Sequence, residues 1–77
     1  MRILSQIPHP KFRIIVYQLE GKYLVEIEAG PMKQAYKLGE EVQGEAGVKA
    51  FLSPAFLDEV HDIFNTMYTQ MQKALKG

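Results

Sequence analysis

The sequence contains no cysteine and no long run of apolar residues. Without cysteine, the chain has no disulfide, no thiolate nucleophile and no cysteine-ligated zinc site. No apolar run approaches the roughly 20 residues that a helix needs to cross a bilayer, and no segment resembles a signal peptide. We therefore expect a cytoplasmic protein without a membrane-spanning segment.

Catalytic motifs are also missing. The glycines at Gly39, Gly44 and Gly47 do not have the spacing of a phosphate-binding loop, and no Lys-Ser or Lys-Thr pair follows them. Neither Ser5 nor Ser53 lies in the strand-turn-helix elbow that exposes a nucleophilic serine. The sequence therefore predicts a protein that is not an enzyme and binds no cofactor.

Two groups of side chains have the chemistry of metal ligands, but neither has a metal-binding pattern. Asp58, His61 and Asp62 are spaced so that one helix face brings them together, yet His61 falls at the boundary between the apolar and polar faces, where a half-buried histidine is typical. The other group consists of Glu40, Glu41 and Glu45. The spacing of these three residues does not match that of a calcium-binding loop. We predict no metal site.

Charge is balanced overall but not along the chain. The formal net charge is zero, which argues against a general polyanion binder. Up to Leu38, six basic residues face three acidic ones, a balance of +3, and after Leu38 three basic residues face six acidic ones, a balance of −3. The first half of the chain is therefore mildly basic. This asymmetry has two explanations: acidic residues cluster in the second half because helix N-termini and loops favour them, or the sheet has a mildly positive face.

The stretch 12–38 predicts three antiparallel strands. Apolar and polar residues alternate from Tyr23 to Ala29 with the period of two that is typical of a strand with one buried face. Glu20-Gly21 and Gly30-Pro31 are two-residue turn signals on either side. Two such turns place Val25 opposite both Val16 and Tyr36. One face then collects the apolar residues Phe12, Ile14, Val16, Tyr23, Val25, Ile27, Ala29, Met32, Tyr36 and Leu38.

The opposite face of these strands is mixed. The register predicts a cross-strand row of Arg13, Glu28 and Lys33, in which alternating charges are mildly stabilising. The same face also has four apolar residues, which lie beside Lys22 and Lys37: Ile15, Tyr17, Leu19 and Leu24. They are an ordinary scatter of exposed residues, a surface covered by the N-terminal strand and loops, or a contact surface for a ligand or second subunit.

The remaining segments complete the sheet and add a helix. Residues 1–7 predict a first strand, and Pro8-His9-Pro10 predicts a turn with His9 solvated at its tip. Residues 39–47 predict a polar loop, and residues 48–52 a single helical turn. Ser53-Pro54 is a strong helix start, and we expect Asp58, Glu59 and Asp62 to complement the helix dipole. The helix should end near Lys76.

The C-terminal helix is predicted to be longer than its sheet. About 23 helical residues span roughly 35 Å, whereas a seven-residue strand spans about 23 Å. The apolar arc of the helix continues to its end, and Val60, Phe64, Met67, Met71 and Ala74 have the 4-3 spacing of an interhelical seam. We expect the overhang to pack against a second copy, with a frayed monomeric end as the alternative. The predicted interface residues are Phe64, Tyr68, Met71 and Leu75.

These elements predict an α+β fold in one domain. A four-stranded antiparallel meander (1–38) is followed by a polar loop with a possible helical turn (39–52) and by one long helix packed on one face of the sheet (53–76).

This β-β-β-β-α order resembles the repeat of the Whirly, Pur-alpha and positive cofactor 4 groups of single-strand nucleic-acid binders. The resemblance implies that two units associate and that a curved sheet contacts the strand. Tyr17 would then stack on a base, with Ile15 and Leu24 as an apolar platform beside it. Four basic residues would bind the phosphates: Arg13, Lys22, Lys33 and Lys37. The IPHP start and the GKYLVEIEAGP hairpin also resemble small bacterial proteins, a resemblance that implies no particular activity.

Two functions remain. The first is a homodimeric module that binds another protein, and the second is a single-stranded nucleic-acid binder that uses the mixed sheet face. The net charge of zero, the single aromatic residue on that face and the presence of Glu26 and Glu28 among its cations favour the first.

Overall fold

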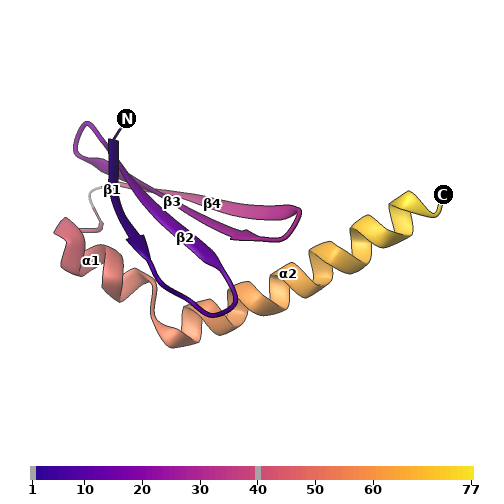
Figure 1. Cartoon of the computed structure of the whole chain (residues 1–77). Coiled ribbons are helices and arrows are strands. Elements are labelled where there is room, and N and C mark those ends of the chain that lie inside the picture. The colour runs from indigo at the N-terminus through magenta and orange to yellow at the C-terminus, as the bar shows by residue number, and fades with distance from the viewer. Residues whose placement is uncertain (1, 40) are drawn as a thin grey trace.

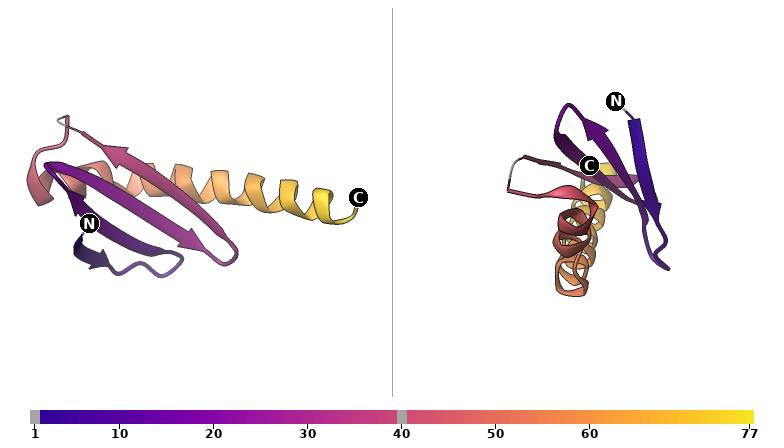
Figure 2. Two further views of the ribbon diagram at one scale, coloured as in Figure 1. Left: turned by 90° about the horizontal axis from the view of Figure 1, so that it is seen from above. Right: turned by 90° about the vertical axis from the view of Figure 1, so that its left-hand side faces the viewer.

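The fold is one antiparallel sheet with two helices on the same face. The computed structural model describes residues 2–39 and 41–77. Its elements are β1 (Arg2–Ile7), β2 (Arg13–Leu19), β3 (Lys22–Ala29), β4 (Met32–Leu38), α1 (Gly44–Phe51) and α2 (Pro54–Leu75). The strands lie in the order β1-β2-β3-β4, and both helices lie on one side of them (Figures 1 and 2). The predicted α+β meander with a long C-terminal helix is confirmed.

The two predicted hairpins have the predicted register. Val25 pairs with Val16 on β2 and with Tyr36 on β4. In the first turn both Glu20 (φ 32°) and Gly21 (φ 78°) have positive φ, as a type I′ turn requires, and in the second Gly30 has a φ of 59° before Pro31. These turns match the twist of the strands, and they therefore determine which side chains share a face.

The face of the sheet toward the helices, called here the inner face, forms the core. Ile14, Val16, Val25 and Ile27 are almost completely buried, and they pack with Val60 and Phe64 of α2. All ten apolar residues predicted for this face are buried in the core or pack against it. Burial of each of these aliphatic side chains stabilises the fold by roughly 1.5–3 kcal/mol.

Strand β1 pairs with β2 antiparallel and forms one edge of the sheet. Its register shifts between Ile3 and Ser5, which leaves Leu4 as an extra residue in the strand. The predicted strand began at Met1, a residue that lies outside the described part of the chain. His9, predicted to be solvated at the tip of the turn, is half-buried: its ring stacks on Phe12 with 4.7 Å between centroids, and its Nδ1 accepts a hydrogen bond from the Lys11 N–H at 3.1 Å.

Helix α1 corrects the prediction for residues 39–52. It begins at Gly44, inside the predicted polar loop, and ends at Phe51. Gln43 precedes it without a side-chain capping hydrogen bond, and Gly44 has a φ of 68°, so the local signals for a helix start are weak. The helix forms because Val48, together with Leu52, is buried in the core. Glu40 lies outside the described residues.

Helix α2 starts as predicted. The Ser53 side chain accepts a hydrogen bond from the Phe56 N–H at 3.2 Å, and Pro54 occupies the first turn. The predicted dipole role of Asp58, Glu59 and Asp62 was wrong, because the first turn holds no acidic residue and the effect of the dipole fades beyond that turn.

One buried polar side chain connects β4 to α2. The Gln34 amide donates a hydrogen bond to the Val60 carbonyl at 3.1 Å, and its oxygen accepts one from the Tyr36 hydroxyl. Gln34 faces the core opposite Ile27. Because a buried amide without partners costs about 1–3 kcal/mol, the bond to Val60 favours one position of the helix along β4, and the bond from Tyr36 satisfies the amide oxygen.

Candidate functional site

Helix α2 consists of two parts with different surroundings. Residues 54–67, called here the packed segment, lie under the sheet, and residues 68–75, called here the projecting segment, extend past the turn between β3 and β4 (Figure 1). At 1.5 Å per residue the projecting segment is about 12 Å long. The predicted overhang is therefore present.

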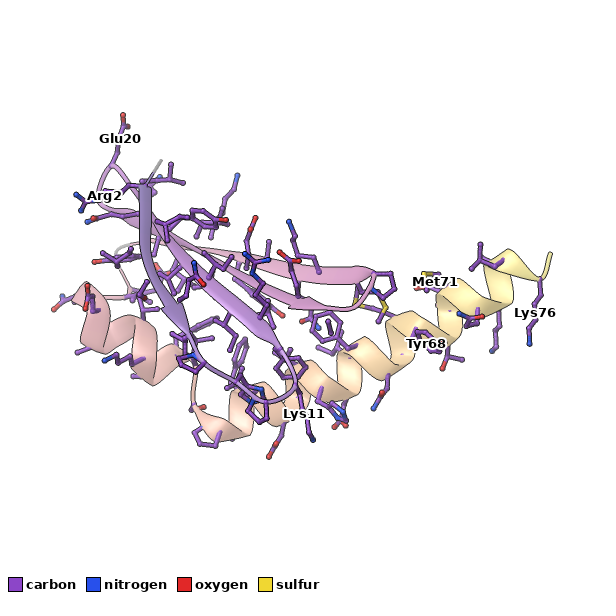
Figure 3. All side chains as sticks on the ribbon, in the orientation of Figure 1. Arg2, Lys11, Glu20, Tyr68, Met71 and Lys76 are labelled. Carbon is purple, nitrogen blue, oxygen red and sulfur yellow. The ribbon has the colours of Figure 1, made fainter. Side chains whose placement is uncertain are left out.

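The projecting segment exposes large apolar side chains. Tyr68 is 49% exposed and Leu75 is 73% exposed, whereas Met71 is half-buried. Figure 3 shows Tyr68 and Met71 on the part of the helix beyond the sheet, with Met71 on the same side of the helix as the sheet. This apolar stripe continues the stripe of the packed segment, but in the described chain no strand lies opposite it.

Phe64 differs from the other three predicted interface residues. It is 3% exposed, and its ring lies 5.6 Å from the ring of Phe12 inside the core of its own chain. A side chain that is already buried offers no surface to a second copy. The candidate contact surface therefore consists of Tyr68, Met71 and Leu75, and Phe64 belongs to the core.

The end of the inner face lies beside this surface. Ala29 and Met32 pair with each other next to the β3–β4 turn, and both are only half-buried. Met67, the last residue of the packed segment, is half-buried as well. The apolar surface beyond the core thus includes the end of the sheet in addition to the helix.

The face of the sheet away from the helices, called here the outer face, is the second candidate site. The register places four cations on it, and all four are exposed: Arg13, Lys22, Lys33 and Lys37. Glu26 and Glu28 lie among them and are half-buried. Four positive and two negative charges leave this face mildly basic.

The apolar residues of the outer face are less accessible than the sequence suggested. Ile15 is only 5% exposed. Its neighbours across the sheet are Gln6 on β1 and Glu26 on β3. Tyr17 and Leu24, which pair with each other, are half-buried. Ile15 therefore supplies no flat surface for a stacked base, and Tyr17 with Leu24 is the accessible apolar part.

The predicted row of alternating charges forms a different ion pair. Lys33 lies opposite Glu28 in the register, but its Nζ is 3.7 Å from Oε1 of Glu26, one position along the same face. The Lys33 side chain is about half exposed, and exposed ion pairs contribute at most about 1 kcal/mol. The pair lowers the number of free cations on the outer face, because it occupies Lys33.

The described residues contain no cluster suited to metal binding. Within residues 2–39 and 41–77, no three acidic or histidine side chains come together as a metal would need. Ser53 is engaged as a helix cap. Hydrogen bonds from the backbone N–H groups of Glu41 and Gly39 hold the pKa of the Glu41 carboxyl below its usual range, which is a local loop effect. None of the helices described is long and apolar enough to span a membrane.

Sequence reasoning missed two exposed apolar residues and one polar link. Ile3 of β1 is 54% exposed and pairs with Tyr17, and Ile63 of α2 is also exposed. Only the three-dimensional placement of their elements separates them from core residues of the same type. The hydrogen bonds of Gln34 had one sequence signal, a polar residue at an inner-face position between Met32 and Tyr36.

Comparison with protein-family models, with curated proteins and with solved structures found no match to this chain.

Proposed function

We propose that the protein is a non-enzymatic, homodimeric module of the cytoplasm that mediates protein–protein interaction. The observation that carries this proposal is the apolar stripe of α2, which continues past the end of the sheet with Tyr68 and Leu75 largely exposed. A helix that ended with the sheet would have no apolar stripe beyond the sheet, whereas this one extends about two turns further.

A two-fold arrangement brings the same surface of each copy together. The projecting segments then lie antiparallel, and each also reaches the end of the other copy's inner face at Ala29 and Met32. Both contacts are needed because a helix pair only about 12 Å long buries far less than the roughly 1,200 Å² of a standard interface. The half-buried state of these two residues in one chain supports this arrangement.

The molar mass in solution tests the proposal. Light scattering or sedimentation over a concentration series should give twice the mass of one chain, and Tyr68→Ser with Leu75→Ser should reduce it to that of one chain. The double variant Thr69→Ala and Gln70→Ala changes the polar face of the same segment and should leave the dimer intact. A single-chain mass for the unmodified protein at high concentration, or a double-serine variant that still dimerises, would disprove this interface.

A second candidate function is single-stranded nucleic-acid binding on the outer face. It is favoured by four exposed cations around Tyr17 on a face that no described helix covers. Its affinity would be salt-dependent, since phosphate contacts release counterions, and base stacking on Tyr17 would favour single strands. Nucleic-acid binding is the second candidate because two acidic residues lie on that face and Lys33 is engaged in an ion pair.

Fluorescence anisotropy with labelled single-stranded and duplex oligonucleotides tests this second function. Charge reversal of Arg13, Lys33 and Lys37 to Glu should abolish binding. The control reverses Lys11, Lys49 and Lys76, which changes the net charge equally but lies off the outer face. Equal loss in both triple variants would indicate general charge attraction and no site on the sheet.

A further inference from the structure

The two edges of the sheet differ in their exposed side chains. On the β4 edge, Lys33 and Lys37 are both exposed, and lysines on an edge strand disfavour pairing with another chain. The β1 edge has one exposed cation, Arg2 at its start, and an exposed apolar residue, Ile3, which is 54% exposed. Within the described residues β1 pairs only with β2, so its other side presents unpaired backbone N–H and C=O groups.

A groove adjoins the β1 edge. It lies between β1 and α1 and has a volume of about 370 Å³, and Figure 2 shows β1 standing apart from α1 at the border of the sheet. Its rim holds one charge of each sign, Glu45 and Lys49, both on α1 and both exposed. Its apolar lining consists of Leu4, Ile7, Pro8, Val16 and Val48.

We propose that β1 and this groove form a binding site for an extended peptide segment of another protein. The segment adds to the sheet as a fifth strand beside β1. Because side chains of a strand alternate between its two faces, every second side chain of the segment points to the inner side, where the groove accepts one aliphatic residue. Backbone hydrogen bonds supply affinity and the groove supplies selectivity. This inference rests on the proposed role in protein–protein interaction and names the class of partner.

The area of the edge favours a peptide over a second copy of the chain. Six residues of strand are about 20 Å long, so pairing along β1 alone covers roughly 400 Å² in total, far below the 1,200–2,000 Å² of stable complexes. An area of this size fits weak, reversible binding of a short segment. It is too small to hold two folded domains together.

The register points the same way. Ile3 and Gln6 lie on the outer face of β1, opposite Tyr17 and Ile15. A second copy of β1, aligned antiparallel over the whole strand with its faces matched, pairs Ile3 with Gln6 and therefore Arg2 with Ile7. That alignment brings a guanidinium group, which in the single chain donates a hydrogen bond to Gln18 (2.8 Å), next to the apolar lining of the groove, whereas a peptide can place an aliphatic residue there.

Selection of peptides tests the proposal and does not require the natural partner. A displayed library of random eight-residue peptides is selected against the protein, and the recovered peptides are measured by fluorescence anisotropy. We expect aliphatic residues at alternate positions, dissociation constants below 1 mM and little change with salt, since the rim has no net charge. The amide signals of residues 2–7 and 45–49 should shift in nuclear magnetic resonance spectra, and those of 33–37, on the other edge, should not.

Two variants and a modified peptide locate the site. Ser5 is half-buried and lines the groove, so Ser5→Phe fills it and should weaken binding at least tenfold, whereas Ser5→Ala leaves it open and should bind as before. Should Ser5→Phe fail to fold, N-methylation of alternate peptide amides removes the strand hydrogen bonds and should weaken binding to the unmodified protein equally.

Several outcomes would overturn the proposal. These are recovery of no binding peptide, equal binding by a correctly folded Ser5→Phe variant, undiminished binding by the N-methylated peptide, or shifts along β4 in place of β1. A loss of dimer mass in Ser5→Phe would assign the groove to a second copy instead. The double-serine variant of α2 changes the mass and leaves peptide binding at β1 unchanged, so failure of the dimer and failure of this site remain distinguishable.

Discussion

The two segments of α2 have the same amphipathic pattern but different surroundings. In the packed segment, Val60 and Phe64 are buried against the sheet, whereas in the projecting segment Tyr68 and Leu75 are exposed. The helix is continuous through both, so the difference arises from what lies opposite each part. An apolar stripe on a helix thus indicates a surface that something packs against. The sheet of the same chain packs against only the first part of the α2 stripe.

The largest expected effect is on the free energy of unfolding, which substitutions in the packed segment should lower far more than substitutions in the projecting segment. Phe64→Ala leaves a cavity in the core and should lower the free energy of unfolding by about 3–5 kcal/mol, enough to unfold much of a small domain. Tyr68→Ala, one turn further along, should change it by less than about 1 kcal/mol at concentrations where the chain is monomeric. Chemical denaturation measures both. Similar losses in the two variants would mean that Tyr68 belongs to the core.

Replacement of Gln34 tests the polar link that holds the packed segment to β4. Gln34→Leu removes both of its hydrogen bonds and should cost about 1–3 kcal/mol, because the Tyr36 hydroxyl loses its acceptor. Adding Tyr36→Phe should recover part of that loss. Gln70→Leu on the projecting segment serves as the control and should have almost no effect on the free energy of unfolding.

The cap of α2 should contribute less. Ser53→Ala removes the hydrogen bond to the Phe56 N–H and should cost about 1 kcal/mol, with recovery in Ser53→Asp. Gln43→Ala is the matched change before α1, where no side-chain cap exists, and should be nearly neutral. Thermal unfolding monitored by circular dichroism measures all three; a neutral Ser53→Ala would show that packing alone holds this end of the helix.

The smallest effect on folding belongs to the end of the projecting segment. Leu75→Ser should change the free energy of unfolding of the monomer by less than about 0.5 kcal/mol, since Leu75 is 73% exposed. The same variant should raise the dissociation constant of the dimer at least tenfold, as measured by sedimentation. A dissociation constant that does not change would remove Leu75 from the proposed interface.

Much of the fold was predictable because its signals are local. The period of two in 23–29 and the turns at Glu20-Gly21 and Gly30-Pro31 predicted the pairing of Val25 with Val16 and Tyr36, which the structure has. Helix α1 was predicted too short because Gln43 provides no cap and Gly44 and Gly47 are weak helix formers. Burial of Val48, a tertiary effect, outweighs those local preferences.

The candidate sites were predictable only in outline. The sequence showed that the apolar arc of α2 outlasts the sheet, yet it did not separate Phe64, buried in the core, from Tyr68, exposed one turn later. It placed Lys33 opposite Glu28, and the flexible lysine side chain instead reaches Glu26. The groove between β1 and α1 has no sequence signal, because it joins segments about 40 residues apart.

The sequence by itself determined strands β2 to β4, their register, the faces of their side chains and the start of α2, because alternation, turn geometry and capping depend on neighbours along the chain. Tertiary structure alone decided how each face is covered: Ile15 is buried although it lies on the helix-free face, Leu75 is exposed although it lies on an apolar stripe, and β1 stands beside an open groove. Burial depends on what packs against a residue from elsewhere in the chain, and no local pattern contains that information.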